Sequence, residues 1–309
     1  MPGSVVEQLL ALREGLCRFN AKHGLRTALL YSGGWFLQWH EGSAAAIDAV
    51  LVQSDAHAGH AHQRVIHRTE GPASLTETLH IASLHSRDKP SDVARRLYSI
   101  ERERELGWDA EPVEIWQCLS APCLVARDDV VAAVARSHVV AVTSEFTESV
   151  DLIKAIGDRT RAPVSYQRFA DGDLRKGDIG AAYVDVASGG QLTRVQALPR
   201  RGLDDNMITL SLRRMQCLVL LLGNRPRAAG MLAASVAHLL GGMPVPPAVR
   251  LVGACAETCA EAAGILAALP GLDIETIDAG TGGRTRTDAV LDMVYSGCTA
   301  PAGLDLLLG

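Results

Sequence analysis

The sequence predicts two modules: an α+β module at the amino-terminal end, followed by an α/β module built on a mainly parallel sheet. The chain has 309 residues, which exceeds the usual size of a single domain. Its composition shifts toward Pro, Arg, Glu and Asp over residues 89–110, and beyond residue 128 apolar strand and helix patterns alternate regularly. We therefore expect modules at residues 1–88 and 128–309, joined by a helical connector at residues 89–127.

The composition excludes several functional classes. Hydrophobic residues make up 48% and charged residues 21% of the chain, values typical of a folded globular protein rather than a disordered one. The formal net charge of -5 gives no basic surface for nucleic acid or for acidic lipid. Seven scattered cysteines suit a reducing compartment, and neither a leader-like start nor a long apolar run is present. We expect a cytoplasmic protein with no nucleic-acid partner and no membrane partner.

The first module opens with an amphipathic helix, since Leu9, Leu12 and Leu16 recur at steps of three and four residues. Two adjacent glycines then predict a tight turn between two strands, and Ser43 is a good N-cap for a second helix. The expected elements are a helix at 5–19, strands at 27–31 and 35–39, a helix at 43–53, strands at 63–67 and 78–84, and a solvated, charged helix at 94–104.

In the second module strand and helix alternate, which implies right-handed crossovers and a mainly parallel sheet covered by helices on both faces. A connecting stretch at 113–125, broken by Pro122, leads into it. The expected strands are 138–142, 180–186, 191–198, 215–222, 249–253 and 272–277, and the expected helices are 149–156, 227–240, 258–269 and 288–295.

One motif in the first module suggests a family. Residues 30–42 read LYSGGWFLQWHEG, preceded by Asn20 and followed by an expected helix. This pattern resembles the BLUF domain, a flavin-binding blue-light sensor of ferredoxin-like fold, over about residues 5–85. The resemblance implies a ferredoxin-like α+β module in which Asn20 and Gln38 occupy the positions of two polar flavin-site residues, with Trp39 beside them.

The first module departs from the BLUF pattern. No tyrosine lies before Tyr31, whereas the family carries its electron-donating tyrosine on a strand that precedes the first helix. The last expected strand also lacks the tryptophan and methionine of the family pattern. We therefore expect no bound FAD and only a remnant of the flavin site at Asn20, Gln38 and Trp39. A sheet without its first strand leaves backbone groups unpaired, and a homodimer would satisfy them.

Four histidines within eleven residues offer an alternative ligand site. Imidazole is a common ligand of zinc and copper, and His57, His60, His62 and His67 are close enough in sequence to converge on one ion. The same stretch carries no fixed acidic or thiol ligand, and an exposed polar loop explains its composition as well. A sensor that binds Zn or Cu is therefore the alternative to a protein without a cofactor.

The second module resembles a Ras-like small GTPase over about residues 138–298. The resemblance rests on the order of strands and helices and on a hairpin formed by the second and third strands. It also rests on the stretch LVLLLGNRP at residues 218–226, which leads into a long helix. The resemblance implies an α/β, mainly parallel sheet with three nucleotide-binding motifs.

None of the three nucleotide motifs is complete. Residues 143–150 read TSEFTESV, without Gly or Lys, and Glu145 and Glu148 place carboxylates where a triphosphate would lie. Asp185 echoes the magnesium motif, but the glycine that should follow it comes one residue late. Glu257 is the one carboxylate left of the guanine motif. We therefore expect a degenerate nucleotide site and a pseudo-GTPase rather than an enzyme.

The sequence favours a non-catalytic signalling or regulatory adaptor that acts through protein partners. A ligand-gated sensor is the first alternative, with a transition metal at the histidines or a flavin-like planar molecule near Gln38. An enzyme with an unrecognised pocket is the second alternative. Absorbance and metal content of the purified protein distinguish the adaptor from the sensor.

Overall fold

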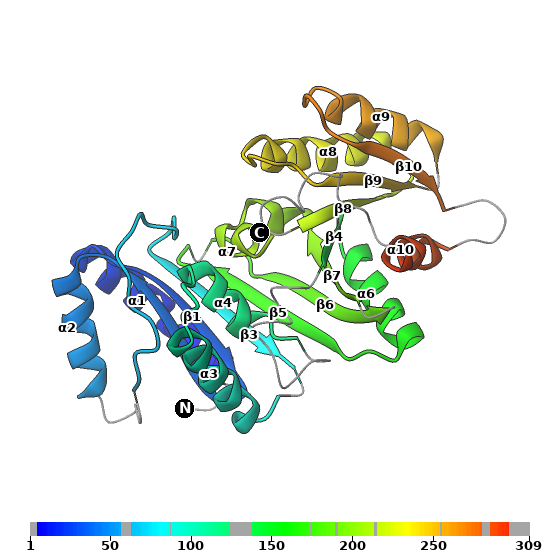
Figure 1. Ribbon diagram of the computed structural model, residues 1–309. Coiled ribbons are helices and arrows are strands. Elements are labelled where there is room, and N and C mark those ends of the chain that lie inside the picture. Colours follow the sequence, from blue (N-terminus) through cyan, green and yellow to red (C-terminus); the bar gives the residue numbers. More distant parts are fainter. Residues whose placement is uncertain are drawn as a thin grey trace. The chain divides into compact units, whose positions relative to one another are not determined.

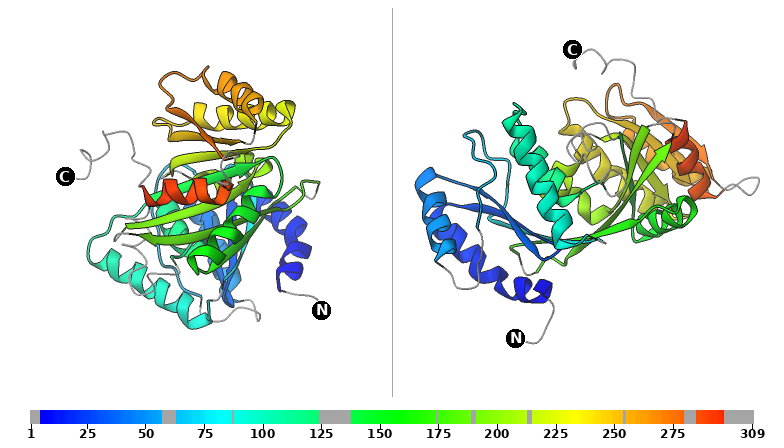
Figure 2. Two further views of the ribbon diagram at one scale, coloured as in Figure 1. Left: turned by 90° about the vertical axis from the view of Figure 1, so that its right-hand side faces the viewer. Right: turned by 60° about the horizontal axis from the view of Figure 1, so that its bottom comes forward.

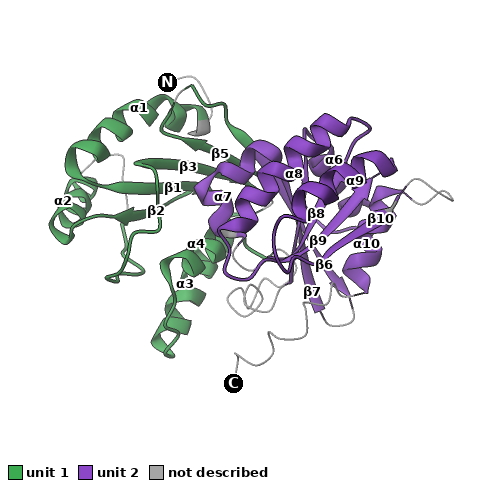
Figure 3. Ribbon diagram, turned by 90° about the horizontal axis from the view of Figure 1, so that it is seen from above, with its two compact units in different colours: residues 1–134, 167–179 green, residues 135–166, 180–309 purple. Residues whose placement is uncertain are grey.

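The computed structural model describes residues 5–56, 63–86, 88–123, 138–173, 175–188, 191–212, 215–253, 255–279 and 285–296. These residues form a mixed α/β fold whose ten strands are largely parallel (Figures 1 and 2). The chain divides into two compact units (Figure 3). Unit 1 comprises Met1–Val134 and Gln167–Ile179, and unit 2 comprises Ala135–Tyr166 and Gly180–Gly309. Each unit combines two separate stretches of sequence, and the expected linear module boundaries stay a prediction.

The described part of unit 1 confirms the expected order of helix, hairpin and helix. Its strand order is β5-β3-β1-β2, in which β1 is antiparallel to β2 and parallel to β3. Gly33 and Gly34 form the hairpin turn with φ of 52° and 86°, which glycine adopts without steric cost. Ser43 Oγ accepts from Ala46 N–H at 3.3 Å and so caps the second helix. The elements are α1 (Val5–His23), β1 (Arg26–Ser32), β2 (Trp35–Glu41), α2 (Ala44–Asp55), β3 (Leu79–His85), α3 (Pro90–Glu105), α4 (Pro112–Ser120) and the end of β5 (Val164–Asp171).

Helices cover both faces of the unit 1 sheet (Figure 3). α1 packs on one face through Leu16 and Cys17. α3 and α4 lie on the other face, where Trp35 Nε1 donates to the first carbonyl of α3 at 2.9 Å. The rings of Trp39 and Trp116, from β2 and α4, lie 6.0 Å apart. The two indoles of β2 therefore pack against helices of their own unit.

Unit 1 differs from the sequence-based expectations in three places. The expected strand at 63–67 is wrong, because these residues have no regular secondary structure and Arg104 Nη1 binds the Ile66 carbonyl instead. The connecting stretch at 113–125 contains most of α4. β5 was not expected, and it places a strand from far downstream in the chain beside β3. The ferredoxin-like arrangement stays a prediction.

Unit 2 has the expected parallel sheet with one hairpin. Its strand order is β10-β9-β8-β4-β7-β6, and its neighbouring strands are parallel except for the β6–β7 hairpin. The elements are β4 (His138–Ser144), α6 (Glu148–Thr160), β6 (Ile179–Ser188), β7 (Gln191–Pro199), η1 (Arg200–Asp204), α7 (Asn206–Ser211), β8 (Met215–Leu222), α8 (Pro226–Gly241), β9 (Ala248–Gly253), α9 (Ala256–Leu266), β10 (Ile274–Asp278) and α10 (Arg286–Tyr295).

The sheet of unit 2 also lies between two layers of helices (Figure 2). α6 and α10 cover one face, where Ile153, Ile156 and Val290 share a core with Val140 and Val219 of the strands. α8 and α9 cover the opposite face. Strand β4 is buried in the middle of the sheet, so its carboxyl end opens onto the edge where ligands bind in folds of this class.

Candidate functional site

The turn after β4 is the expected position of a ligand in unit 2. β4 pairs with β7 on one side and with β8 on the other, and the chain then leaves β4 toward α6. In open α/β sheets, ligands bind outside the carboxyl ends of the strands where the direction of winding changes. The structure places Glu145 within this turn and Glu148 at the first residue of α6.

Two buried serines close this turn from within. Ser149 N–H donates to Ser144 Oγ at 3.0 Å, and the Ser149 hydroxyl donates to the Leu198 carbonyl at 3.3 Å. Phe146 N–H donates to the Glu148 carboxylate at 3.2 Å. A phosphate-binding loop would offer such backbone N–H groups to a nucleotide. In this turn the N–H groups of Phe146 and Ser149 already donate to side chains of the same chain.

Glu145 is paired inside the turn. Its Oε2 lies 3.0 Å from Nε of Arg200, at the start of η1. Both atoms are buried and are not aligned as a hydrogen bond, so attraction between the charges holds the contact. A phosphate would have to displace Glu145 from Arg200 and would then face the carboxylates of Glu145 and Glu148. Repulsion between like charges disfavours a polyanion at this turn.

Asp185 is ion-paired with Arg194 on the β6–β7 hairpin. It lies directly opposite Arg194, whose Nε and Nη2 donate to its two oxygens at 2.8 and 2.9 Å. The side chains of Arg194 and Asp185 are 7% and 1% exposed. The Arg194 guanidinium also lies 4.3 Å from the centre of the Tyr183 ring. A magnesium ion would have to break this two-bond pair to reach the carboxylate.

Glu257 has a local structural role as well. It lies exposed in the first turn of α9, two residues after the N-cap Cys255. A carboxylate at this end of a helix interacts favourably with the helix dipole. Each of the four acidic residues expected at the nucleotide site therefore has a structural explanation that needs no ligand.

The expected histidine site falls mostly outside the described residues. His57, His60 and His62 belong to a stretch that the structure does not describe. His67 is described and half-buried, and burial together with the nearby charge of Arg104 lowers its pKa. Among the described residues, no three His, Cys, Asp or Glu side chains are grouped as metal ligands.

The three residues of the flavin-site remnant do not share one surface. Asn20 is buried, and its Nδ2 donates to the Thr78 carbonyl at 2.8 Å. Gln38 is exposed, and its Oε1 lies 2.9 Å from His40 Nε2. Trp39, the next residue along β2, points to the opposite face and contacts α4. The Asn20 amide is thus bound to backbone, and Trp39 is half-buried beside α4.

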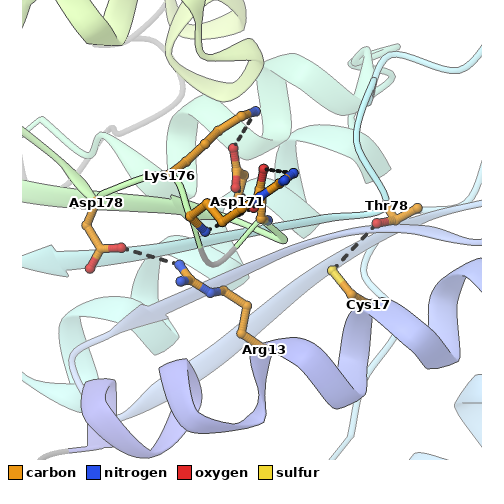
Figure 4. A network of polar contacts seen from close by, with 8 residues as sticks. Arg13, Cys17, Thr78, Asp171, Lys176 and Asp178 are labelled. Carbon is orange, nitrogen blue, oxygen red and sulfur yellow. Dashed lines mark hydrogen bonds and ion pairs between the residues drawn. The ribbon is translucent and has the colours of Figure 1, made fainter.

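A polar network that the sequence did not reveal ties α1 to the segment after β5 (Figure 4). Asp178 accepts from Arg168 Nε at 2.7 Å and from Arg13 Nη1 at 3.4 Å. In the same segment Lys176 Nζ lies 2.9 Å from an oxygen of Asp171. The available signal was the charged run DGDLRKGD that begins at the end of β5. Its acidic and basic residues hold the segment to the sheet and to α1.

His80 of β3 is buried within reach of this network. Its Nε2 has no hydrogen-bond partner among the described residues. Burial lowers its pKa to about 4, against the smaller opposing effect of Asp171. The imidazole is therefore neutral near pH 7 and gains a charge only in acid.

Comparisons with known proteins do not assign the chain to a family. A scan against models of protein families gives no match, and a search among curated proteins gives no significant match. No helix in the described part of the chain combines the length and the apolar character needed to cross a bilayer. Function is therefore inferred from the geometry of this chain alone.

Proposed function

We propose that the protein is a non-catalytic regulatory adaptor of the cytoplasm, in which a BLUF-like module and a pseudo-GTPase module act through protein contacts. The turn after β4 carries this proposal. The N–H groups of Phe146 and Ser149 are bound within the chain, and Arg200 is paired with Glu145. A turn whose donors and cation already have partners holds no nucleotide.

The adaptor proposal needs a surface for partners, and unit 1 offers one. β2 is the edge strand in the order β5-β3-β1-β2, and Phe36 on this strand is 49% exposed. The adjoining helix α2 is rich in Ala, Val, Ile and Leu, yet none of its side chains is buried. Apolar side chains beside an edge strand favour pairing with another chain. A second copy in a closed two-fold dimer is the partner we propose.

A sensor for a planar ligand is the second candidate, and one observation favours it. Phe36 and Gln38 are exposed on the same face of β2, and the Tyr31 ring lies 5.3 Å from the Phe36 ring. Aromatic rings beside an amide suit a planar heterocycle. Asn20 weighs against this candidate, because its amide is bound to the Thr78 carbonyl.

Isothermal titration of magnesium GTP into the full chain tests the adaptor proposal. We expect no binding at micromolar nucleotide. A double variant, Glu145→Gln with Glu148→Gln, removes the like charges but keeps the serine closure, so we expect no binding there either. Micromolar affinity in the wild-type protein would contradict the pseudo-GTPase proposal. Binding gained only in the double variant would show that charge, and not closure, excludes the nucleotide.

Light scattering of the full chain at tens of micromolar tests the dimer. We expect a homodimer that Phe36→Glu dissociates, because the change places a charge on the edge strand. Val245→Glu is the matched control, since Val245 is an exposed apolar residue of unit 2. A monomeric wild-type protein overturns the dimer. Visible absorbance and metal analysis of the same sample test the sensor candidate.

A further inference from the structure

Unit 1 holds a buried arginine that uses only part of its hydrogen-bonding capacity. Arg96 lies on the buried face of α3, in line with Val93 and Ile100. Its side chain is 5% exposed, as is that of Asp88, and Nη1 donates to Asp88 Oδ2 at 2.6 Å. Nε and Nη2 have no hydrogen-bond partner among the described residues. Burying charged donors without acceptors is costly, so this arrangement favours the arrival of an acceptor.

The two unused donors form one edge of the guanidinium group. Arg194 uses the same two atoms, Nε and Nη2, to bind Asp185 at 2.8 and 2.9 Å. This fork matches the spacing of the two oxygens of a carboxylate. Arg96 therefore presents a complete carboxylate-binding edge inside unit 1.

Ser32 adds a hydroxyl group at the same end of the sheet. It is the last residue of β1, it is fully buried, and its Oγ has no hydrogen-bond partner in the described part of the chain. Ser32 pairs with Trp35 across the hairpin, so both side chains share one face, and Trp35 reaches the first carbonyl of α3. A Cβ on the adjacent Gly33 would meet Val93 of α3 at 2.9 Å. The Ser32 hydroxyl therefore faces the helix that carries Arg96.

We infer that Arg96 and Ser32 bind a small monovalent carboxylate between α3 and the end of β1. Nε and Nη2 of Arg96 donate to the two oxygens of the ligand, and Ser32 Oγ donates to one of them. Asp88 holds the guanidinium from its other end and already neutralises it, so a monovalent carboxylate leaves the three groups with one net negative charge. A divalent oxyanion would leave more uncompensated charge in a buried site, which is unfavourable. This site does not depend on the adaptor function proposed above.

Side-chain NMR of the full chain tests the inference. The arginine Nε–H resonances are followed while sodium acetate replaces sodium chloride at constant ionic strength. We expect one resonance to shift saturably and the unfolding temperature to rise with acetate. In Arg96→Lys, which keeps the charge and removes the fork, both responses should be lost. Arg95→Lys alters the exposed neighbour on the same helix and should respond like the wild-type protein.

A second variant keeps the test decisive if Arg96→Lys does not fold. Ser32→Ala leaves the guanidinium in place, and we expect its affinity for acetate to fall about tenfold, as for the loss of one hydrogen bond to a charged group. Unchanged affinity in Ser32→Ala overturns the two-residue site. No saturable response of the wild-type protein to acetate or formate overturns the inference, since Arg96 then binds only water. Phosphate binding more tightly than acetate overturns the monovalent class.

Discussion

In the described part of the chain, each unit holds an arginine–aspartate pair whose two side chains are both buried, and the two pairs differ in the donors they use. Arg194 of unit 2 binds Asp185 through Nε and Nη2 and stacks on Tyr183, whereas Arg96 of unit 1 binds Asp88 through Nη1 alone. The two arginine side chains are nearly equally buried, at 7% and 5% exposure. Burial alone therefore does not show whether an ionic group is satisfied. The number of donors with partners decides that.

The backbone that carries each pair explains the difference. Asp185 and Arg194 are directly opposite residues of an antiparallel hairpin, so the strand register holds them side by side. Arg96 instead reaches from the middle of α3 to Asp88, which precedes the helix. This contact meets the guanidinium at its end and leaves the fork unused. The cross-strand pair therefore uses two donors of its arginine, whereas the helix-to-loop pair uses one.

Asp185→Asn should destabilise the protein most, by about 3 to 5 kcal/mol, because it leaves the buried charge of Arg194 uncompensated. Asp88→Asn is the matched change in unit 1, and it also leaves a buried arginine charge uncompensated. It should cost less, about 3 kcal/mol, because it weakens one charged hydrogen bond rather than two. Urea denaturation of both variants near neutral pH measures the two losses. Equal losses would break the comparison between the units.

His80 extends the comparison to a buried group of unit 1 that titrates. Its pKa is about 4 in the folded protein against 6.5 for an ordinary histidine. Between these values the unfolded chain binds a proton that the folded chain does not. The free energy of unfolding should therefore fall as the pH drops through this window, by about 3 kcal/mol in total.

The urea midpoint measured from pH 7 to pH 4 checks this prediction. His80→Gln should flatten the pH dependence over the window. A smaller slope of the same sign remains in the variant, because burial also lowers the pKa of His40. An unchanged slope in His80→Gln would show that His80 is charged in the folded protein.

Ser149→Ala tests the closure of the turn after β4. The change removes the hydroxyl that donates to the Leu198 carbonyl, and it should cost about 1 to 2 kcal/mol. Thr147→Ala is the matched control, because Thr147 precedes α6 without a side-chain cap bond. Thermal unfolding of both variants checks the difference. If the two changes cost the same, the serine bonds do not hold the turn.

The exposed pair of Glu14 and Arg18 on α1 gives the smallest expected effect. Its side chains are 63% and 70% exposed, so water screens the contact. Glu14→Gln should change the stability by less than about 0.5 kcal/mol, and less still in high salt. Urea denaturation at two salt concentrations measures this. A loss of stability as large as that of Asp88→Asn would show that burial does not explain the large losses expected for the two buried pairs.

Hydropathy patterns predicted most elements of unit 2, because apolar runs and helical spacing follow directly from burial. Hydropathy does not predict β5, because its polar residues are buried and an aromatic residue is exposed. Ser165 and Gln167 are buried, while Tyr166 between them is exposed. α4 lies in a stretch that Pro122 indicates as a connection rather than a helix. Pro112 at the first helical position and Glu114 in a capping box were the missed signals of a helix start.

The candidate sites differ in how many of their residues and contacts the sequence predicts. Motif spacing located the turn after β4 and its two glutamates, since topology fixes the carboxyl end of a parallel strand. It could not show the bond from Ser149 to Leu198, which joins residues far apart in the chain. Arg96 belongs to a charged helix that the sequence indicates as solvated. Only packing against the sheet shows that this one arginine is buried.

A crystal structure of the full chain grown with acetate tests the difference between the two buried pairs most directly. We expect a planar ligand with two oxygens within hydrogen-bond distance of Arg96 Nε and Nη2, next to Ser32 Oγ. The same edge of Arg194 should be filled by Asp185. A single water on the Arg96 edge, or an Arg96 fork bound to a carbonyl of the protein, would contradict this account. It holds that Nε and Nη2 of Arg96 are available to a ligand, whereas those of Arg194 bind Asp185.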